Sequence, residues 1–295
     1  MRFNKLFRKE AQKKFKVGLA FGGGGTKGFA HIGAIKAFEE NGITFDEVSG
    51  TSVGSIAATF YAFGLTSQEM MQKAKSIKVN DIRNSKLFFV PSKTDGLENF
   101  IKNSIGDAYF EDMKKPLTIV AVDLKSAKEV HLTKGSIAKA VAGSCAVPGI
   151  FNPVDFGEYR LADGGLQNTI PADVLRNNGC RYVISIDCNS TRGQGTDSTK
   201  LVDILFASIR IMMKSNAIKG KVYSDICIDI DTGKYKSTSL EGADEMYKMG
   251  YEATLKAIPK IKELLGQKQK FNLFGMFKKN KKRELKKQKK QAIDD

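Results

Sequence analysis

The chain of 295 residues contains no tryptophan and only two histidines, His31 and His131. Few residues can therefore act as an imidazole base or as an imidazole metal ligand. Paired cysteines are also absent, because no Cys-x-x-Cys spacing occurs. We expect buried free thiols in a reducing cytoplasm rather than disulfides or a zinc motif. The four cysteines are Cys145, Cys180, Cys188 and Cys227.

Long apolar runs are missing as well. The first residues are charged and contain no apolar core of a secretory signal. The uncharged stretch 48–68 is rich in Gly, Ser and Thr, which makes it a poor membrane-spanning helix. We expect a cytoplasmic protein that is soluble or peripheral on the inner membrane surface.

Positive charge is concentrated at the two ends of the chain, whose net charge is +16. Residues 1–16 carry seven Lys or Arg and one acidic residue, and residues 268–295 carry eleven and three. The residues between them carry 30 and 28, so the middle of the chain is nearly neutral. We therefore predict a basic N-terminal segment (1–16), a globular domain (17–266) and a basic C-terminal tail (267–295).

Both ends combine basic residues with apolar ones. The tail contains the cluster FNLFGMF (271–277) before a basic block. Such segments suit an anionic membrane surface, and a solvated, frayed tail has a similar composition. Basic tails also bind nucleic acid, although clustered Phe and Leu favour lipid. In residues 1–16 the apolar side chains at helical spacing are Phe3, Leu6, Phe7, Ala11 and Phe15.

Apolar and amphipathic segments alternate along the domain, and the opening order is strand, helix, strand, helix. This order predicts an α/β fold, a three-layer α/β/α arrangement around an open, mostly parallel sheet. The least regular part, 66–115, is either a cap over a cleft or a surface excursion. Strands are predicted at 17–21, 43–48, 117–124, 129–132, 158–162, 182–187 and 226–230. Helices are predicted at 27–41, 55–63, 67–75, 96–105, 136–144, 171–178, 201–213 and 243–265.

The stretch Gly50-Thr51-Ser52-Val53-Gly54 has the form G-x-S-x-G and lies between an apolar run and a helical segment. Glycines on either side of a serine permit the strained turn of a nucleophile elbow, which leaves the hydroxyl free at its tip. The N–H groups that open the following helix place positive potential near that oxygen. We therefore predict that Ser52 is a nucleophile.

The glycine-rich stretch 22–28 allows three interpretations. A P-loop requires Gly-Lys-Ser/Thr, and the order here is Thr26-Lys27-Gly28. The dinucleotide fingerprint G-x-G-x-x-G is present, but the second strand ends in Ser49-Gly50 rather than in the acidic residue that binds ribose. The third interpretation is an oxyanion hole, in which backbone N–H groups of residues 23–25 face a developing negative charge. The nearby elbow favours the third.

A serine nucleophile needs a base. In α/β-hydrolases the order is serine, acid, histidine, and no histidine follows Asp163 in this chain. His31 lies in apolar company in the first helix, and His131 ends a predicted strand without a motif around it. Asp163, followed by two glycines, is the remaining candidate, because burial can raise the pKa of a carboxyl into the working range. An Asp-Gly hairpin turn is the structural alternative.

Taken together, the ordered motifs resemble those of the patatin-like phospholipases over residues 16–190. Thr26 stands where Ala or Ser is frequent, and Lys27 where Arg is frequent. The matching segments are 22–33 (GGGGTKGFAHIG), 50–55 (GTSVGS), 121–124 (AVDL), 142–149 and 163–165 (DGG).

The resemblance implies a lipid acyl hydrolase with a Ser52–Asp163 dyad, an acyl-enzyme and no metal or other cofactor. Its substrate would be a phospholipid or another acyl lipid. The resemblance does not extend to the basic ends, whose composition alone favours an anionic membrane surface. An inactive hydrolase scaffold that binds membrane or nucleic acid is the alternative, and a dinucleotide-dependent oxidoreductase is more distant. The implied site comprises an oxyanion hole (Gly23, Gly24, Gly25, Thr26, Lys27, Gly28), the elbow (Gly50, Thr51, Val53, Gly54) and Gly164 and Gly165 beside Asp163.

Overall fold

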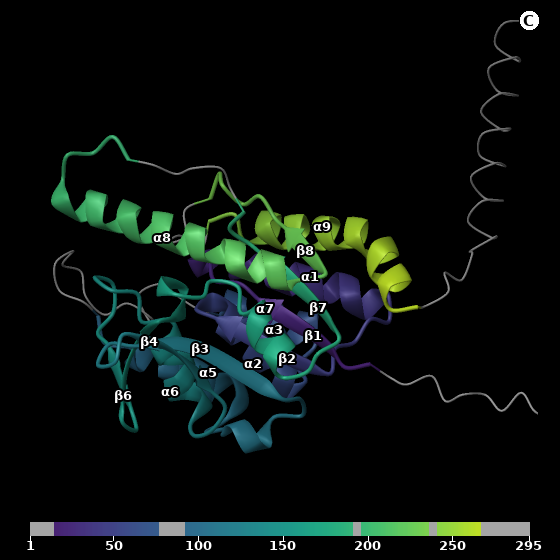
Figure 1. Ribbon diagram of the computed structural model, residues 1–295, viewed down its shortest axis with the longest axis horizontal. Coiled ribbons are helices and arrows are strands. Elements are labelled where there is room, and N and C mark those ends of the chain that lie inside the picture. The colour runs from purple at the N-terminus through teal and green to yellow at the C-terminus, as the bar shows by residue number, and fades with distance from the viewer. Residues whose placement is uncertain (1–14, 77–91, 191–195, 236–240, 267–295) are drawn as a thin grey trace, which may run out of the picture. The chain divides into compact units, whose positions relative to one another are not determined.

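A computed structural model describes residues 15–76, 92–190, 196–235 and 241–266 (Figure 1). The basic tail and nearly all of the N-terminal segment lie outside these ranges, as does most of the irregular stretch 78–94. Residues 1–258 form one compact unit, and residues from Pro259 onward belong to a second. The predicted domain boundaries stay predictions.

Eight strands of the described residues form one mixed sheet, with the order β5-β6-β3-β2-β1-β7-β8 and with β4 also paired to β3. The neighbouring strands β3, β2, β1, β7 and β8 are parallel to one another. Strands β4 and β6 pair antiparallel with β3, and β5 pairs antiparallel with β6. This arrangement confirms the predicted, mostly parallel α/β architecture. The strands are β1 (Val17–Phe21), β2 (Glu47–Thr51), β3 (Leu117–Asp123), β4 (Lys128–Leu132), β5 (Val154–Phe156), β6 (Tyr159–Asp163), β7 (Tyr182–Asp187) and β8 (Ile226–Asp229).

Helices flank this sheet. Helices α2 and α6 pack against the strands with α1 beside α2, and α7 packs against β1, β2 and β7 with α8 beside it. None of the described helices is both long and apolar enough to cross a membrane. The helices are α1 (Phe29–Glu40), α2 (Val53–Phe63), α3 (Ser67–Lys75), α5 (Asp95–Ile105), α6 (Ile137–Ser144), α7 (Ala172–Asn177), α8 (Leu201–Tyr223) and α9 (Ala243–Leu264), with short 3-10 helices η1 (Gly25–Gly28), η2 (Phe110–Asp112) and η3 (Gly164–Leu166).

Small and branched side chains fill the space between α7, α8 and the sheet. Parallel strands are covered on both faces, which explains why β1, β3 and β7 are almost wholly buried apolar runs. The cluster there consists of Ala20, Ile170, Ala172, Leu175, Cys180, Val183 and Ala217.

Four predictions from the sequence need correction. The second strand occupies 47–51 instead of 43–48, because the apolar residues before it are buried in the connection rather than in the sheet. Strand β5 was not predicted, since three residues give too little pattern. Helix α8 continues ten residues beyond position 213. Cys227 is only half-buried, whereas the other three free cysteines are buried.

Tertiary contacts explain the length of α8. The residues beyond its predicted end include Asn216 and Gly220, which are weak helix formers. The Asn216 side-chain amide donates to the Leu166 carbonyl at 2.7 Å, and Gly220 lies so close to the Ile170 carbonyl that a Cβ would overlap it. These contacts override the weak local preference for helix.

Candidate active site

Ser52 occupies the sharp turn between β2 and α2. Its φ is 53°, in the left-handed region that non-glycine residues seldom adopt. A Cβ at Gly50 would overlap the Gly54 carbonyl, and one at Gly54 would overlap the last carbonyl of β1. The two glycines are therefore required by close backbone approach, and the turn has the geometry predicted for a nucleophile elbow.

Strand β3 brings Asp163 to this turn. On one edge β3 pairs with β4, and on its other edge it pairs first with β2 and then with β6. Thr51 lies opposite Val120, and Asp163 lies opposite the next residue, Ala121. The carboxyl ends of β2 and β6 thus meet on a shared edge of β3, and Ser52 directly follows one of them.

The Asp163 carboxylate is only 1% exposed. Its Oδ1 accepts a hydrogen bond from the Gly165 N–H at 2.8 Å, and its Oδ2 has no hydrogen-bond partner among the described residues. Burial raises the pKa of this carboxyl to about 6, while the nearby Ser52 hydroxyl and the Gly165 N–H lower it. Since Oδ2 remains unpartnered, the Ser52 hydroxyl is close to the carboxylate without a well-formed hydrogen bond, as is common before substrate binds.

Ser144, at the end of α6, holds the elbow in place through hydrogen bonds of its hydroxyl. Its hydroxyl donates to the Val120 carbonyl at 2.6 Å and accepts from the Ser52 N–H at 2.9 Å. One buried side chain therefore links β3 to Ser52. No motif in the sequence singles out this serine, although it lies in the stretch 142–149 that matches the family.

The glycine loop follows β1 and faces the elbow. The Gly22 N–H donates to the Ile186 carbonyl and the Gly23 N–H to the Thr169 carbonyl, both at 3.0 Å. The N–H groups of Gly24 and Gly25 make no hydrogen bond within the described part of the chain. Of the three predicted oxyanion donors, we therefore expect Gly24 and Gly25 to be the available ones.

Neither histidine is placed as a base. His31 is fully buried, and its Nε2 lies 2.8 Å from the Gly22 carbonyl oxygen, to which it donates. Burial lowers the pKa of His31 to about 4, so its ring is neutral and holds the glycine loop in position. His131 lies on β4 with its Nε2 2.7 Å from Glu129 Oε1.

Lys27 anchors the other side of the glycine loop. Its side chain is 2% exposed, and its Nζ donates to Asn189 Oδ1 at 2.7 Å, just beyond the end of β7. Burial lowers the pKa of this ammonium. The Cys188 thiol packs against the same loop, 3.7 Å from the Gly23 carbonyl oxygen.

Two further residues connect the loop after Asp163 to the rest of the site, and no sequence motif marks either of them. The Asn168 carbonyl accepts from the Thr51 hydroxyl at 2.8 Å. The Thr169 carbonyl holds the glycine loop, and its hydroxyl donates to the Met213 carbonyl of α8 at 2.6 Å. The elbow, the glycine loop (22–28) and the loop after Asp163 (164–169, called the aspartate loop below) are thus joined at the carboxyl ends of the parallel strands. In α/β sheets this is where ligand sites lie.

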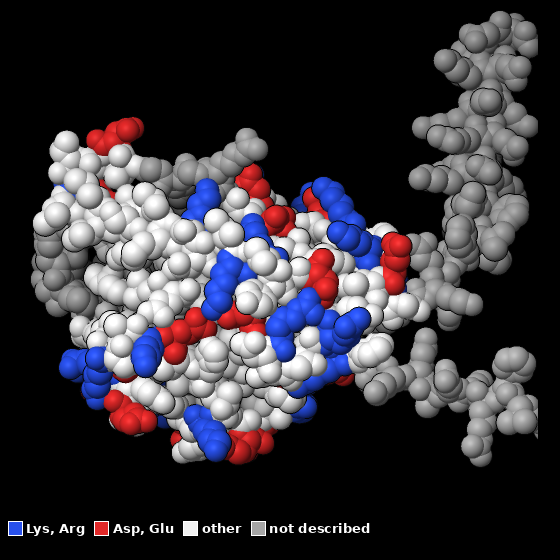
Figure 2. Space-filling model, in the orientation of Figure 1, with Lys and Arg blue, Asp and Glu red and all other residues white. Residues whose placement is uncertain are grey.

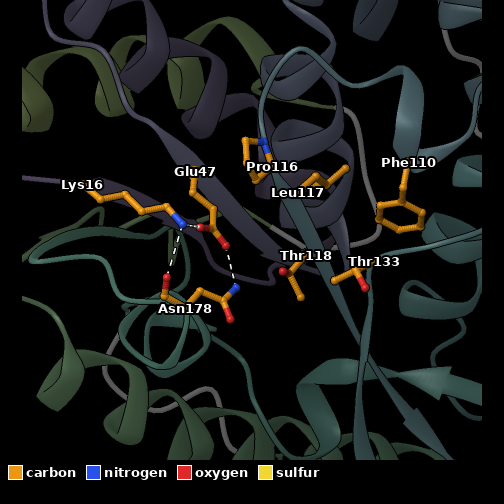
Figure 3. Close-up of a pocket in the computed structure, with 8 residues that line it drawn as sticks. All are labelled: Lys16, Glu47, Phe110, Pro116, Leu117, Thr118, Thr133 and Asn178. Carbon is orange, nitrogen blue, oxygen red and sulfur yellow. Dashed lines mark hydrogen bonds and ion pairs between the residues drawn. The ribbon is translucent and has the colours of Figure 1, made fainter.

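A pocket of about 460 Å³ lies at the opposite end of β2 (Figure 3). There the buried Glu47 carboxylate pairs with the Lys16 ammonium and accepts from the Asn178 side-chain amide at 2.5 Å. The charge of Glu47 is thus satisfied within the protein. Glu47 is the first residue of β2, and Ser52 directly follows the last one. The length of β2, about 15 Å, therefore separates this pocket from Ser52.

Comparison with known proteins gives one family. The family model described as patatin-like phospholipase matches residues 19–176. An uncharacterised NTE family protein of Mycobacterium tuberculosis is 30% identical over 192 residues, which cover 64% of this chain and 33% of the relative. Neuropathy target esterase sws of Drosophila melanogaster is 32% identical over 203 residues (64% and 14%). Lysophospholipase NTE1 of Mycosarcoma maydis is 28% identical over 279 residues (82% and 15%).

The chain thus spans a third or less of the length of these three relatives. Among solved structures, VipD from Legionella pneumophila matches with a TM-score of 0.58 and 17% sequence identity. The match covers 84% of this chain and 67% of VipD, and it extends the likeness of fold beyond the part that the family model covers.

Proposed function

This chain belongs to the patatin-like phospholipase family, and from that premise we propose that it is a lipid acyl hydrolase with Ser52 as nucleophile and Asp163 as general base. The observation that carries the proposal is the meeting of the two residues on the shared edge of β3, with a buried carboxylate whose pKa is about 6. A carboxyl with that pKa is mostly ionised at neutral pH and still basic enough to accept a proton.

In the first half-reaction Ser52 Oγ attacks the ester carbonyl carbon while Asp163 takes the hydroxyl proton. The N–H groups of Gly24 and Gly25 stabilise the negative oxygen of the tetrahedral intermediate. The bond to the leaving alcohol then breaks, and Asp163 returns the proton to the alcohol oxygen. The product is an acyl ester of Ser52 and a free alcohol.

In the second half-reaction Asp163 takes a proton from water, which attacks the acyl-enzyme. The bond between the acyl carbon and Ser52 Oγ breaks, and the proton passes to the serine oxygen. A fatty acid is released and the dyad is restored. Acyl esters of phospholipids or lysophospholipids are the substrates that the names of the relatives favour, since these include an esterase and a lysophospholipase.

We also propose that the basic ends, residues 1–16 and 267–295, hold the enzyme on an anionic cytoplasmic leaflet. Each Lys or Arg near such a surface contributes about 1 kcal/mol of binding free energy. Removal of residues 267–295 should therefore weaken sedimentation with anionic vesicles, and most strongly at low salt. Equal binding of the two proteins would refute this role.

Release of fatty acid from phospholipid and lysophospholipid tests the dyad. Ser52→Ala and Asp163→Asn should each lower the rate by at least about a thousandfold. Matched controls are Ser208→Ala and Asp155→Asn, which change exposed residues of α8 and β5 and should leave the rate unchanged. Undiminished hydrolysis by either dyad variant would overturn the assignment. A fluorophosphonate probe should label Ser52, whereas an inactive scaffold that binds membrane or nucleic acid would not react.

A further inference from the structure

Helix α8 exposes more apolar surface than any other element of the described chain. Of twelve large apolar side chains exposed among the described residues, eight lie on this helix. Soluble proteins seldom expose contiguous apolar patches of this kind unless the patch meets a partner. The eight are Leu201, Ile204, Leu205, Ile211, Met212, Ile218, Val222 and Tyr223.

Four of these side chains form a line. Ile204, Ile211 and Ile218 are seven residues apart, which is two helical turns, and Val222 lies one turn further. Their exposed fractions are 43%, 63%, 62% and 76%. These four residues, called the α8 stripe below, extend over about 27 Å of one helix face. Figure 2 shows a largely uncharged surface over α8, with Lys and Arg side chains beside it.

The opposite face of α8 covers the aspartate loop. The Met213 side chain packs against Gly165, where a Cβ would overlap it. The Asn216 side-chain amide donates to the carbonyl groups of Gly165 and Leu166, at 3.3 and 2.7 Å. The α8 stripe therefore lies about one helix diameter, about 10 Å, from the aspartate loop, which directly follows Asp163.

The charge of α8 distinguishes between possible partners. The helix carries four basic residues and one acidic residue. Lys219 pairs with Asp173 and Lys221 with Asp187, and Arg210 is exposed beside the α8 stripe. A second copy of the helix would bring like charges together, which is unfavourable. An anionic lipid surface would accept both the apolar line and the cations, as it does with interfacial amphipathic helices.

We propose that the α8 stripe docks on the surface of a phospholipid bilayer and thereby places the catalytic loop at the membrane. This inference rests on the proposed function for its choice of partner, and it adds a docking element separate from the basic ends. The stripe inserts its apolar side chains among the acyl chains, while Arg210 faces the head groups.

Vesicle sedimentation tests the docking. The full chain carries Ser52→Ala, so that hydrolysis does not alter the lipid, and the vesicles contain phosphatidylcholine and phosphatidylglycerol. Salt of about 1 M shortens the Debye length to about 3 Å and suppresses the contribution of the basic ends. Under these conditions the triple substitution I204S/I211S/I218S should weaken the partition coefficient by at least about tenfold.

The matched control is Y109S/L124S/L255S, which removes three exposed apolar side chains from other elements. It should leave the partition coefficient within about twofold of the parent. Equal binding of the α8 variant and its parent would overturn the proposal. So would a parent that is dimeric without lipid and becomes monomeric through the triple substitution, because a second copy would then cover the stripe. Unchanged hydrolysis of a soluble short-chain ester by the triple variant with Ser52 intact separates loss of docking from failure of the proposed chemistry.

A second measurement needs only one substitution on the stripe. Because the chain contains no tryptophan, Ile211→Trp introduces a single indole on the stripe. On addition of vesicles its emission should shift to shorter wavelength and be quenched by brominated lipid, whereas the indole of Leu124→Trp should do neither. An emission spectrum of Ile211→Trp that vesicles leave unchanged would refute insertion of the stripe.

Discussion

Replacing Asp163 by asparagine removes a buried charge and keeps the shape of the side chain. Burial raises the pKa of this carboxyl from 3.8 to about 6. The folded protein therefore binds the proton more tightly than the unfolded chain does. The stability that goes with the neutral carboxyl is fully present below the unfolded pKa and is lost as the pH rises to about 6. Above that pH the ionised carboxylate costs the fold about 3 kcal/mol.

Asparagine does not ionise, so Asp163→Asn should escape this cost. We expect the substitution to be more favourable to stability at about pH 8 than at about pH 4, by about 2 to 3 kcal/mol. An amide also adds N–H donors where Oδ2 has no partner among the described residues, and that cost cancels because it is the same at both pH values. Relative to the wild type, the variant should therefore be more stable at about pH 8 than at about pH 4, while it loses hydrolysis at both.

Urea unfolding followed by circular dichroism at both pH values measures the effect. Asp123→Asn is the control, because hydrogen bonds from the Ser126 hydroxyl and the Arg160 N–H lower the pKa of Asp123 to about 2, so that this carboxyl is ionised in the folded protein at both pH values. That substitution should change the free energy of unfolding by nearly the same amount at both pH values. If Asp163→Asn changes the free energy of unfolding equally at both pH values, the carboxyl is not the strained base inferred from its burial.

Three more predictions address the site. The rate of hydrolysis in a pH-stat should rise with a midpoint of about 6, the pKa of Asp163, and a distant midpoint would contradict its role as base. Gly54→Ala should lower the free energy of unfolding by at least about 3 kcal/mol through overlap with β1, whereas Gly42→Ala, at an open left-handed turn, should cost about 1 kcal/mol; similar costs in urea would argue against the tight elbow. Ser144→Ala should slow fluorophosphonate labelling of Ser52 by about tenfold, since the Ser52 N–H loses its acceptor; an unchanged labelling rate would remove Ser144 from the positioning network.

Patterns in the sequence were enough to predict the fold class and the sharp turn at Ser52, whereas the chemistry of the dyad stays a prediction. The elbow was predictable because Gly50 and Gly54 mark a turn that other residues cannot form. The candidate base emerged from the scarcity of histidine. These features depend on residues close together in the chain, whose backbone preferences are strong.

The geometry of the site was not predictable, because it depends on strand register between distant segments. A shift of β6 by one residue along β3 would turn the Asp163 side chain to the other face of the sheet. Ser144 and Thr169 have no local pattern that marks them, since their roles arise only when α6 and the aspartate loop reach β3 and the glycine loop. The α8 stripe was missed because weak helix formers beyond position 213 hid the full length of the helix.

In the proposed mechanism, the shared edge of β3 also governs when the protein acquires its activity. Ser52, the proposed nucleophile, precedes Asp163, the proposed base, in the chain. Each residue lies at the end of a strand that β3 aligns. During synthesis Ser52 leaves the ribosome long before Asp163 does, so the growing chain carries the serine hydroxyl without its proposed base. Because the pairing is non-local, it forms late in folding. In the proposed mechanism, hydrolysis of membrane lipids therefore begins only when the sheet is complete.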